Sequence, residues 1–234
     1  MGDPTMTVAY PEGAVTRVRR EFKLVLEESE AEVVCRRLRF ELGAPPAETA
    51  ITSVYFDQPG SPLAQRAQRT PQDCLKVRTK EYFPDQLTGA EPRVVLEAKL
   101  ERNGLTRKRR RWLSRGELPS HFGRQDGGLQ PTVAVTYVRQ VYQHTASWRV
   151  TVDRDIRYYR VDEGLALGLQ PVTAQRLGSP TGCEQRVVLE VKHFGQGLPE
   201  WLEMLQERRS RRFSKFAEGV AQLASTPKFG IRGG

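Results

Sequence analysis

The sequence predicts an α+β fold: an antiparallel β-sheet of about eight strands, enough to close into a barrel, with helices flanking it. Charged and apolar residues alternate with a period of two in segments that recur along the chain, as expected for strands with two different faces. Turn-forming residues separate these segments. Two other stretches carry apolar residues at helical spacing, which accounts for the helices.

The first strand is expected at residues 17–27, where Phe22 and Leu24 point to one side and Glu21 and Lys23 to the other. The same alternation predicts further strands near residues 50–57, 73–82, 92–101, 105–113, 132–142, 147–154 and 185–193.

The first helix is expected directly after the first strand. Ser29, with Glu32 three residues later, has the spacing of a capping box, and Gly43 is a typical helix end. The segment from Pro199 to about Ala224 is predicted to form one broken helix or two short ones.

The chain of 234 residues is long enough for one domain with an adequate core. We expect this domain at residues 17–226, after a poorly ordered leader at 1–16 and before a tail at 227–234. No apolar run reaches the roughly 20 residues that a membrane-spanning helix needs, and the leader lacks the apolar stretch of a signal peptide. We therefore expect a cytoplasmic protein that does not itself insert into a membrane.

The charge and the cysteines limit the possible partners. A net charge of +9 and a pI near 9.7 favour an anionic partner such as nucleic acid, polyphosphate or an acidic surface. Cys35, Cys74 and Cys183 form no C-x-x-C arrangement, so we expect buried thiols rather than disulfides or a zinc site.

Charged residues gather on one face of the predicted sheet. They form the motifs Arg19-x-Glu21-x-Lys23, Lys76-x-Arg78-x-Lys80, Glu97-x-Lys99-x-Glu101, Arg149-x-Thr151-x-Asp153 and Glu190-x-Lys192. This face is either the solvated outer side of an antiparallel sheet or the lining of a barrel. In a barrel, the bases would bind a polyanion and the glutamates would hold Mg²⁺ or Mn²⁺. The sequence has no G-x-x-x-x-G-K-[ST] or G-x-G-x-x-G loop, so side chains would have to hold the phosphates.

The order of these elements resembles the triphosphate tunnel enzymes, and within them the VTC-type polyphosphate polymerase domains. The resemblance covers about residues 17–223. Beyond the first strand it rests on Ser53-Val54-Tyr55-Phe56-Asp57 with Leu63, Leu75-Lys76-Val77-Arg78 with Tyr82, Glu97-Ala98-Lys99, Thr106-Arg107-Lys108-Arg109-Arg110, Tyr137-Val138-Arg139, Arg149-Val150-Thr151-Val152-Asp153, Leu189-Glu190-Val191-Lys192 and Phe213-Ser214-Lys215-Phe216. It implies that the sheet closes into a triphosphate tunnel.

The resemblance also implies a set of site residues. The basic side chains that would line the tunnel and bind phosphates are Lys23, Lys76, Arg78, Lys99, Lys108, Arg139, Arg149 and Lys215. Glu190 would hold Mn²⁺ or Mg²⁺, Arg212 and Ser214 would lie near the phosphate path, and Tyr137 would touch a nucleobase near the tunnel mouth. Glu21 and Glu97 are expected either to join the metal site or to neutralise neighbouring lysines.

The function implied by the resemblance is an ATP-dependent polyphosphate polymerase, with ATP and inorganic polyphosphate as its partners. Two alternatives stay open: hydrolysis of tripolyphosphate or a nucleoside triphosphate, and polyphosphate binding without catalysis. Whether a membrane-bound partner takes part also stays open.

The basic run from Arg107 to Arg111 raises the possibility of nucleic-acid binding, since clustered cations release counterions from a phosphate backbone. No RNP-type or helix-turn-helix signature accompanies the run, so we expect no nucleic-acid partner. Alternation puts Lys108 and Arg110 inside the barrel. Tyr82 and Trp112 are expected to pack at strand ends.

Overall fold

A computed structural model describes residues 19–43, 48–84, 93–102, 105–122, 128–144, 147–194, 198–207 and 213–225. The strands are β1 (Arg19–Leu26), β2 (Thr49–Asp57), β3 (Cys74–Pro84), β4 (Arg93–Arg102), β5 (Leu105–Ser114), β6 (Gln130–His144), β7 (Trp148–Tyr159), β8 (Gly182–Glu184) and β9 (Val187–Phe194). The helices are α1 (Glu28–Leu42), α2 (Pro62–Arg69), α3 (Leu118–His121), α4 (Glu163–Leu167), α5 (Ala174–Leu177), α6 (Glu200–Glu207) and α7 (Lys215–Ser225). The expected leader and tail lie outside the described residues.

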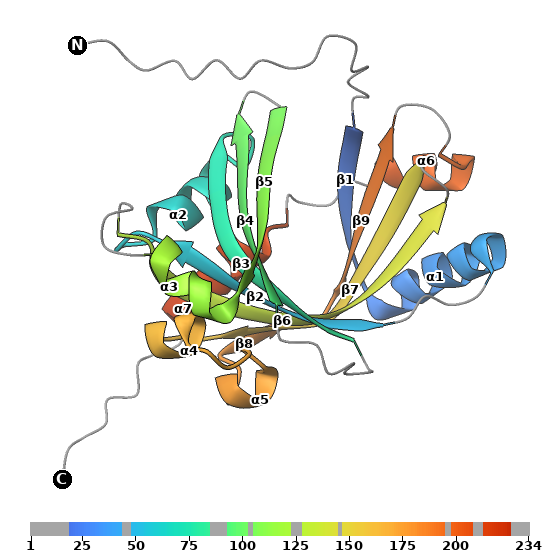
Figure 1. Cartoon of the computed structure of the whole chain (residues 1–234). Coiled ribbons are helices and arrows are strands. Elements are labelled where there is room, and N and C mark those ends of the chain that lie inside the picture. Colours follow the sequence, from blue (N-terminus) through green and yellow to red (C-terminus); the bar gives the residue numbers. More distant parts are fainter. Residues whose placement is uncertain are drawn as a thin grey trace, which may run out of the picture.

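All nine strands belong to one antiparallel sheet in the order β1-β9-β7-β6-β2-β3-β4-β5, with β8 paired to β7. The sheet is strongly curled: β3, β4 and β5 rise on one side of Figure 1, β1, β9 and β7 rise on the other, and β2 and β6 form the base. The predicted α+β fold, with a curled antiparallel sheet and flanking helices, is confirmed.

The curled sheet is a half-barrel rather than a closed one, because the strand order ends at β1 and β5 and pairs them with each other nowhere in the described ranges. Across the inside of the curl, Lys99 Nζ of β4 lies 3.9 Å from Glu21 Oε1 of β1. This ion pair links the two sides of the half-barrel.

Two irregularities help to bend the sheet. The pairing of β2 with β6 shifts register between Tyr55 and Phe56, and the pairing of β6 with β7 shifts between Thr136 and Val138. Near the second shift, Asp155 has a left-handed backbone with φ of 52°. Such bulges increase the local bend and twist of a strand. The strand β7 extends beyond the predicted 147–154, on past the second shift.

The outer face of the sheet carries two apolar cores. On one half, α1 and α6 cover apolar residues of β1, β7 and β9, including Leu24, Val150 and Leu189. On the other half, Phe122 stacks on Phe56 of β2, with ring centroids 3.9 Å apart. The predicted alternation is confirmed, since these apolar positions are buried and the charged ones face the opposite way.

A third core lies on the inner face, the side of the sheet that carries Tyr55. There α2 and α7 pack on β2, β6 and β7. Phe216 of α7 stacks on Tyr55 with ring centroids 4.9 Å apart. Gly219 allows the close approach, because a Cβ atom there would lie 2.9 Å from side-chain atoms of Tyr158 and Val133. This packing fixes Lys215, the first residue of α7, on the inner face.

Three local predictions need comment. The segment after Pro199 forms two short helices, α6 and α7, rather than one broken helix. The capping box at Ser29 is wrong: the N-cap of α1 is Glu27, two residues earlier, and the Glu27 amide donates to Glu30 Oε2 at 3.3 Å. Cys183 is exposed rather than buried, because it lies on the short strand β8 at the margin of the sheet.

Candidate functional site

The inner face gathers most of the predicted site residues. Strand register and side-chain contacts place on it the basic residues Lys23, Lys76, Arg78, Lys80, Lys99, Lys108, Arg110, Arg139, Arg149, Lys192 and Lys215 and the acidic residues Glu21, Glu97, Glu101, Asp153 and Glu190. Basic side chains outnumber acidic ones, so the curled face is a cationic surface. Three buried or nearly buried carboxylates organise it.

Glu97 of β4 is the first of these centres. Its side chain is 1% exposed and accepts hydrogen bonds from Arg78 Nε at 2.9 Å and Arg110 Nε at 2.7 Å, while Lys108 Nζ lies 2.8 Å away. Burial alone would raise the pKa of Glu97, but the surrounding cations hold that pKa far below its usual value. Arg78 Nη1 also donates to Tyr55 Oη at 2.8 Å. Glu97 therefore fixes three cations on neighbouring strands in one place.

Asp153 of β7 is the second centre. Arg139 donates to its two carboxylate oxygens through Nε and Nη2, both at 2.6 Å, and Lys215 Nζ donates at 2.6 Å. Burial alone would raise the pKa of Asp153, but Lys215 and Arg139 hold it at about 2. Through Asp153, α7 is joined to the sheet, and the Arg139 and Lys215 side chains are both held in fixed orientations.

Tyr137 lies inside this second group. Its ring is 2% exposed, with Lys215 Nζ at 4.7 Å and Arg139 Cζ at 5.2 Å from its centroid. Cations over an aromatic face are held by its quadrupole. The structure thus places Tyr137 within the cationic surface rather than at an exposed edge. Contact between Tyr137 and a nucleobase stays a prediction.

Glu190 of β9 is the third centre. Lys192 Nζ lies 2.7 Å from Glu190 Oε1, and a hydrogen bond joins the carboxyl groups of Glu190 and Glu21. Burial and the neighbouring charge of Glu190 raise the pKa of Glu21. Burial alone would raise the pKa of Glu190 too, but the hydrogen bond with Glu21 and the charge of Lys23 keep it well below its usual value. The two carboxyl groups therefore interact directly, and their environments shift their pKa values in opposite directions.

The Glu190 group fits a hard divalent cation. Thr151 is the register partner of Glu190, and its buried hydroxyl has no hydrogen-bond partner in the part of the chain that the structure describes. A buried hydroxyl left in this state suits a ligand or water that completes the site. Mg²⁺ and Mn²⁺ commonly take one or two protein carboxylates and fill their other positions with phosphate oxygens and water. Within the described ranges no cluster of three or more His, Cys, Asp or Glu residues offers a complete protein cage.

The other predicted site residues that the structure describes lie around the three carboxylate centres. Lys23 Nζ donates to the backbone oxygen of Phe213 at 3.5 Å. Arg149 lies opposite Lys192 in the sheet register. The hydroxyl of Ser214 accepts a hydrogen bond from the Ala217 amide at 3.5 Å, which places it at the start of α7. Arg212 lies outside the described residues.

Two lysines of β3 carry an electrostatic cost. Burial lowers the pKa of Lys76, and Lys23 lowers it further. Lys80 is 3% exposed, and burial together with the charge of Arg78 lowers its pKa well below the usual value. A bound polyanion would relieve this repulsion between cations, and the relief would contribute to the free energy of binding.

Some residues of the site were quoted in the sequence motifs without a site role. They are Tyr55, Lys80, Arg110, Asp153 and Lys192. Lys80, Arg110 and Lys192 each lie two residues from an assigned residue, so strand alternation alone was a usable signal for these three. Tyr55 and Asp153 lie opposite Arg78 and Arg139 on the adjacent strands, a pairing that alternation does not reveal.

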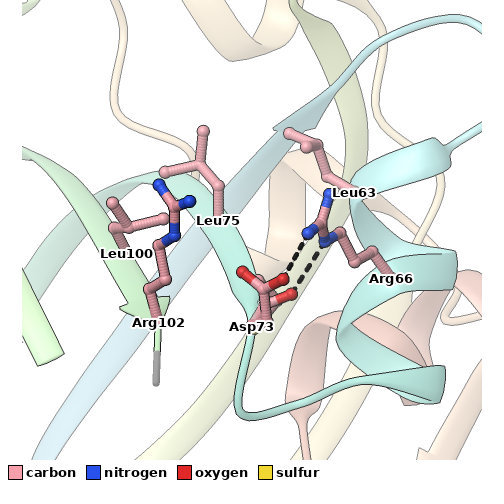
Figure 2. Close-up of a pocket in the computed structure, with 7 residues that line it drawn as sticks. Leu63, Arg66, Asp73, Leu75, Leu100 and Arg102 are labelled. Carbon is pink, nitrogen blue, oxygen red and sulfur yellow. Dashed lines mark hydrogen bonds and ion pairs between the residues drawn. The ribbon is translucent and has the colours of Figure 1, made fainter. Parts of the chain in front are cut away.

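A separate pocket lies at the ends of β3 and β4 beside α2 (Figure 2). Its lining consists of Leu63, Arg66, Asp73, Cys74, Leu75, Leu100 and Arg102, none of which is a predicted phosphate or metal residue. Arg66 Nε donates to the Asp73 backbone oxygen at 2.8 Å and its guanidinium pairs with the Asp73 carboxylate. The pocket is therefore closed on one side by a structural ion pair.

We expect polyphosphate affinity to fall as the pH rises from about 7 to about 9, and Lys108 to cause part of the fall. Burial lowers the pKa of Lys108 to about 8, against the opposing attraction of Glu97. Below that value the ammonium group is charged; above it the charge is lost. Anion binding raises this pKa, so binding near pH 8 takes up protons.

Calorimetric titration of tripolyphosphate in two buffers of different ionisation enthalpy measures this uptake. Tripolyphosphate itself titrates in this range, so the informative quantity is the difference between wild type and Lys108→Arg, whose guanidinium stays charged. Equal proton uptake by the two proteins would contradict the assignment.

The VTC domain family matches the sequence over residues 18–120 and 117–224. The chain therefore belongs to the VTC domain family, which indicates a phosphate-handling protein whose function involves polyphosphate. No curated protein matched the sequence.

Several solved structures are similar in outline. The PH1819 protein of Pyrococcus horikoshii OT3 is 14% identical, with 92% of this chain and 95% of that chain covered and a TM-score of 0.46. A conserved hypothetical protein of Pyrococcus furiosus is 12% identical, with 88% and 91% covered and a TM-score of 0.37. A chain of the Schizosaccharomyces pombe Mediator head module is 14% identical, with 88% and 90% covered and a TM-score of 0.43.

Among the described residues, no helix is both long enough and apolar enough to cross a bilayer.

Proposed function

We propose that this protein is a metal-dependent polyphosphate polymerase that transfers the γ-phosphate of ATP to the end of an inorganic polyphosphate chain. The observation that carries the proposal is the cationic inner face, with its bases held by Glu97 and Asp153 and its carboxyl pair at Glu190. Membership of the VTC family supports the same substrate class.

The residues of the inner face have separate roles in this proposal. Arg78, Lys108 and Arg110 present their nitrogen atoms from around Glu97, and would bind phosphate oxygens on the β3 to β5 side. Arg139 and Lys215, oriented by Asp153, would bind phosphates on the opposite side. The two groups together would hold a chain of phosphates in an extended line.

Glu190, with Glu21 and Thr151 beside it, would hold Mn²⁺ or Mg²⁺. The ion would neutralise charge on the phosphates and help to align them. Burial and the neighbouring Glu190 raise the pKa of Glu21, and a bound cation would oppose this rise because it favours the carboxylate form.

The reaction needs no side-chain nucleophile. A terminal oxygen of the chain attacks the γ-phosphorus of ATP, one P–O bond forms, and the bond from that phosphorus to the bridging oxygen breaks. ADP leaves with the electron pair and the chain gains one phosphate. Positioning and charge compensation supply most of the acceleration in phosphoryl transfer, and the inner face offers both.

Product analysis tests the proposal. The purified protein is incubated with ATP and Mn²⁺, with and without a short polyphosphate primer; the polymer is resolved by size and ADP is quantified. We expect a series of growing chains, with one ADP formed for each phosphate incorporated. ADP and free phosphate without polymer would indicate a hydrolase, and tight binding without turnover would indicate a binding module; either result would refute the polymerase.

A further inference from the structure

Two aromatic residues at one edge of the inner face are left exposed by the fold. Trp112 of β5 is 55% exposed and Tyr82 of β3 is 38% exposed. Their ring centroids lie 6.2 Å apart, with the ring planes tilted by 39°. The two rings contact each other, but packing at strand ends does not account for so much exposed aromatic surface.

Tyr82 and Trp112 lie on β3 and β5, the two strands that carry the cations bound to Glu97. Trp112 follows Arg110 by two residues and Lys108 by four, so all three project from the same side of β5. Tyr82 follows Arg78 by four residues on β3 and lies on the same side. A strand rises about 3.3 Å per residue, so the Trp112 backbone lies about 13 Å along β5 from Lys108.

The Tyr82 hydroxyl also lies within the electrostatic field of the cations on the inner face. Burial raises the pKa of Tyr82, and the charges of Arg110, Arg78 and Arg139 oppose this rise. Tyr82 thus lies between these cations and Trp112, whose ring it contacts. A ligand held here would have an anionic part toward Arg78 and an aromatic part toward Trp112.

We infer that Trp112 and Tyr82 form a stacking site for the nucleobase of a nucleoside triphosphate whose phosphates extend toward Lys108 and Arg78. The inference rests on the proposed function. An extended triphosphate and its ribose match the separation between Lys108 and Trp112 in scale. Stacking uses the π-face that every base has, so the site selects nucleotides over free polyphosphate more strongly than it selects among bases.

The alternative of a docking surface for a protein has less support. Trp112 and Tyr82 form a patch of two rings bordered by arginines, whereas large partners are recognised by wider apolar patches. Other large exposed apolar residues, such as Phe40 and Met204, lie on the helices α1 and α6, which cover the other half of the sheet from outside.

The test compares two ligands that differ in the nucleoside. Affinities for a non-hydrolysable ATP analogue and for tripolyphosphate are measured by calorimetry with wild type, Trp112→Ala and Phe40→Ala. Phe40 is the matched control, because it is an exposed aromatic residue on the outer helix α1. We expect Trp112→Ala to weaken binding of the ATP analogue by about 10- to 100-fold and to leave tripolyphosphate binding within about twofold of wild type. Phe40→Ala should change neither.

Intrinsic fluorescence gives a second measurement. The chain has three tryptophans, of which Trp148 is buried and Trp201 packs against the same outer core. The ATP analogue should quench the exposed Trp112 in wild type, tripolyphosphate should not, and the quenching should be absent in Trp112→Phe. Equal quenching by both ligands would overturn the inference.

The outcomes separate the two proposals. If tripolyphosphate binds and Trp112→Ala leaves binding of the ATP analogue unchanged, the nucleobase site is refuted while the phosphate site stands. If wild type binds neither ligand, the proposed function fails and takes the inference with it. Equal weakening of both ligands in Trp112→Ala would show that Trp112 supports the phosphate site and stacks on no base.

Discussion

Replacing Glu190 with Gln should lower ATP turnover on the order of 100- to 1,000-fold, because the loss of a metal ligand removes several kcal/mol of charge stabilisation. Gln fills nearly the same volume and keeps one acceptor oxygen, but it carries no negative charge. The charge matters at this position: the Glu190 side chain is only 14% exposed and lies beside Glu21 and Lys192. It also lies opposite Thr151, whose hydroxyl has no hydrogen-bond partner among the described residues. Because Gln is nearly isosteric with Glu, the variant should fold, and it should still bind phosphates through the other cations.

The measurement is ATP turnover as a function of Mn²⁺ concentration, together with Mn²⁺ binding followed by electron paramagnetic resonance in the presence of tripolyphosphate. Glu203→Gln, at an exposed position on α6, is the matched control. Normal turnover with an unchanged Mn²⁺ dependence in Glu190→Gln would show that the metal lies elsewhere.

Replacing Arg78 with Ala should weaken tripolyphosphate binding by about 10- to 100-fold, the range expected when a charged hydrogen-bond donor is lost. Arg78 bridges Glu97 and Tyr55, so its guanidinium is already oriented before a ligand arrives. In the variant, Lys108 and Arg110 still neutralise the buried Glu97 carboxylate. The tripolyphosphate affinity of Arg78→Lys should lie between those of wild type and Arg78→Ala, because lysine keeps the charge but not the planar fork.

Affinity for tripolyphosphate is measured by calorimetry, and the melting temperature shows that each variant is folded. Arg157→Ala is the matched control: Arg157 is half exposed and pairs with Asp155 near the bulge in β7. If Arg78→Ala binds tripolyphosphate as tightly as wild type, Arg78 does not contact the phosphates and the inner face is not the binding surface.

Much of the fold follows from alternation in the sequence. Phe22 and Leu24 are buried under α1 and α6 while Glu21 and Lys23 face the other way, as a period of two requires. The limits of the predictions are also local. The left-handed residue Asp155 shifts the alternation within β7, and no residue type marks that bulge in advance.

The site was less accessible from the sequence, because its centres depend on contacts between strands. Glu97 faces Arg78 and Arg110 only through the β3-β4-β5 register. Asp153 meets Lys215 because α7 packs on the inner face, 62 positions further along the chain. Alternation places such residues on a face but does not say which of them meet, so Asp153 had no predicted role.

The choice between a solvated outer sheet face and a barrel lining also depended on three-dimensional contacts. Lys99 of β4 reaches Glu21 of β1, although five strands lie between β1 and β4 in the sheet order. Such a contact requires the charged face to be the concave one. A flat solvated sheet would keep the two side chains far apart.

A crystal structure with tripolyphosphate and Mn²⁺, in which anomalous scattering locates the metal, tests the central claim most directly. We expect the phosphates on the inner face between the Glu97 and Asp153 groups, with Mn²⁺ about 2.1 Å from a Glu190 oxygen. Phosphates bound to Arg107, Arg109 and Arg111 on the outer side of β5, with no metal at Glu190, would contradict the account.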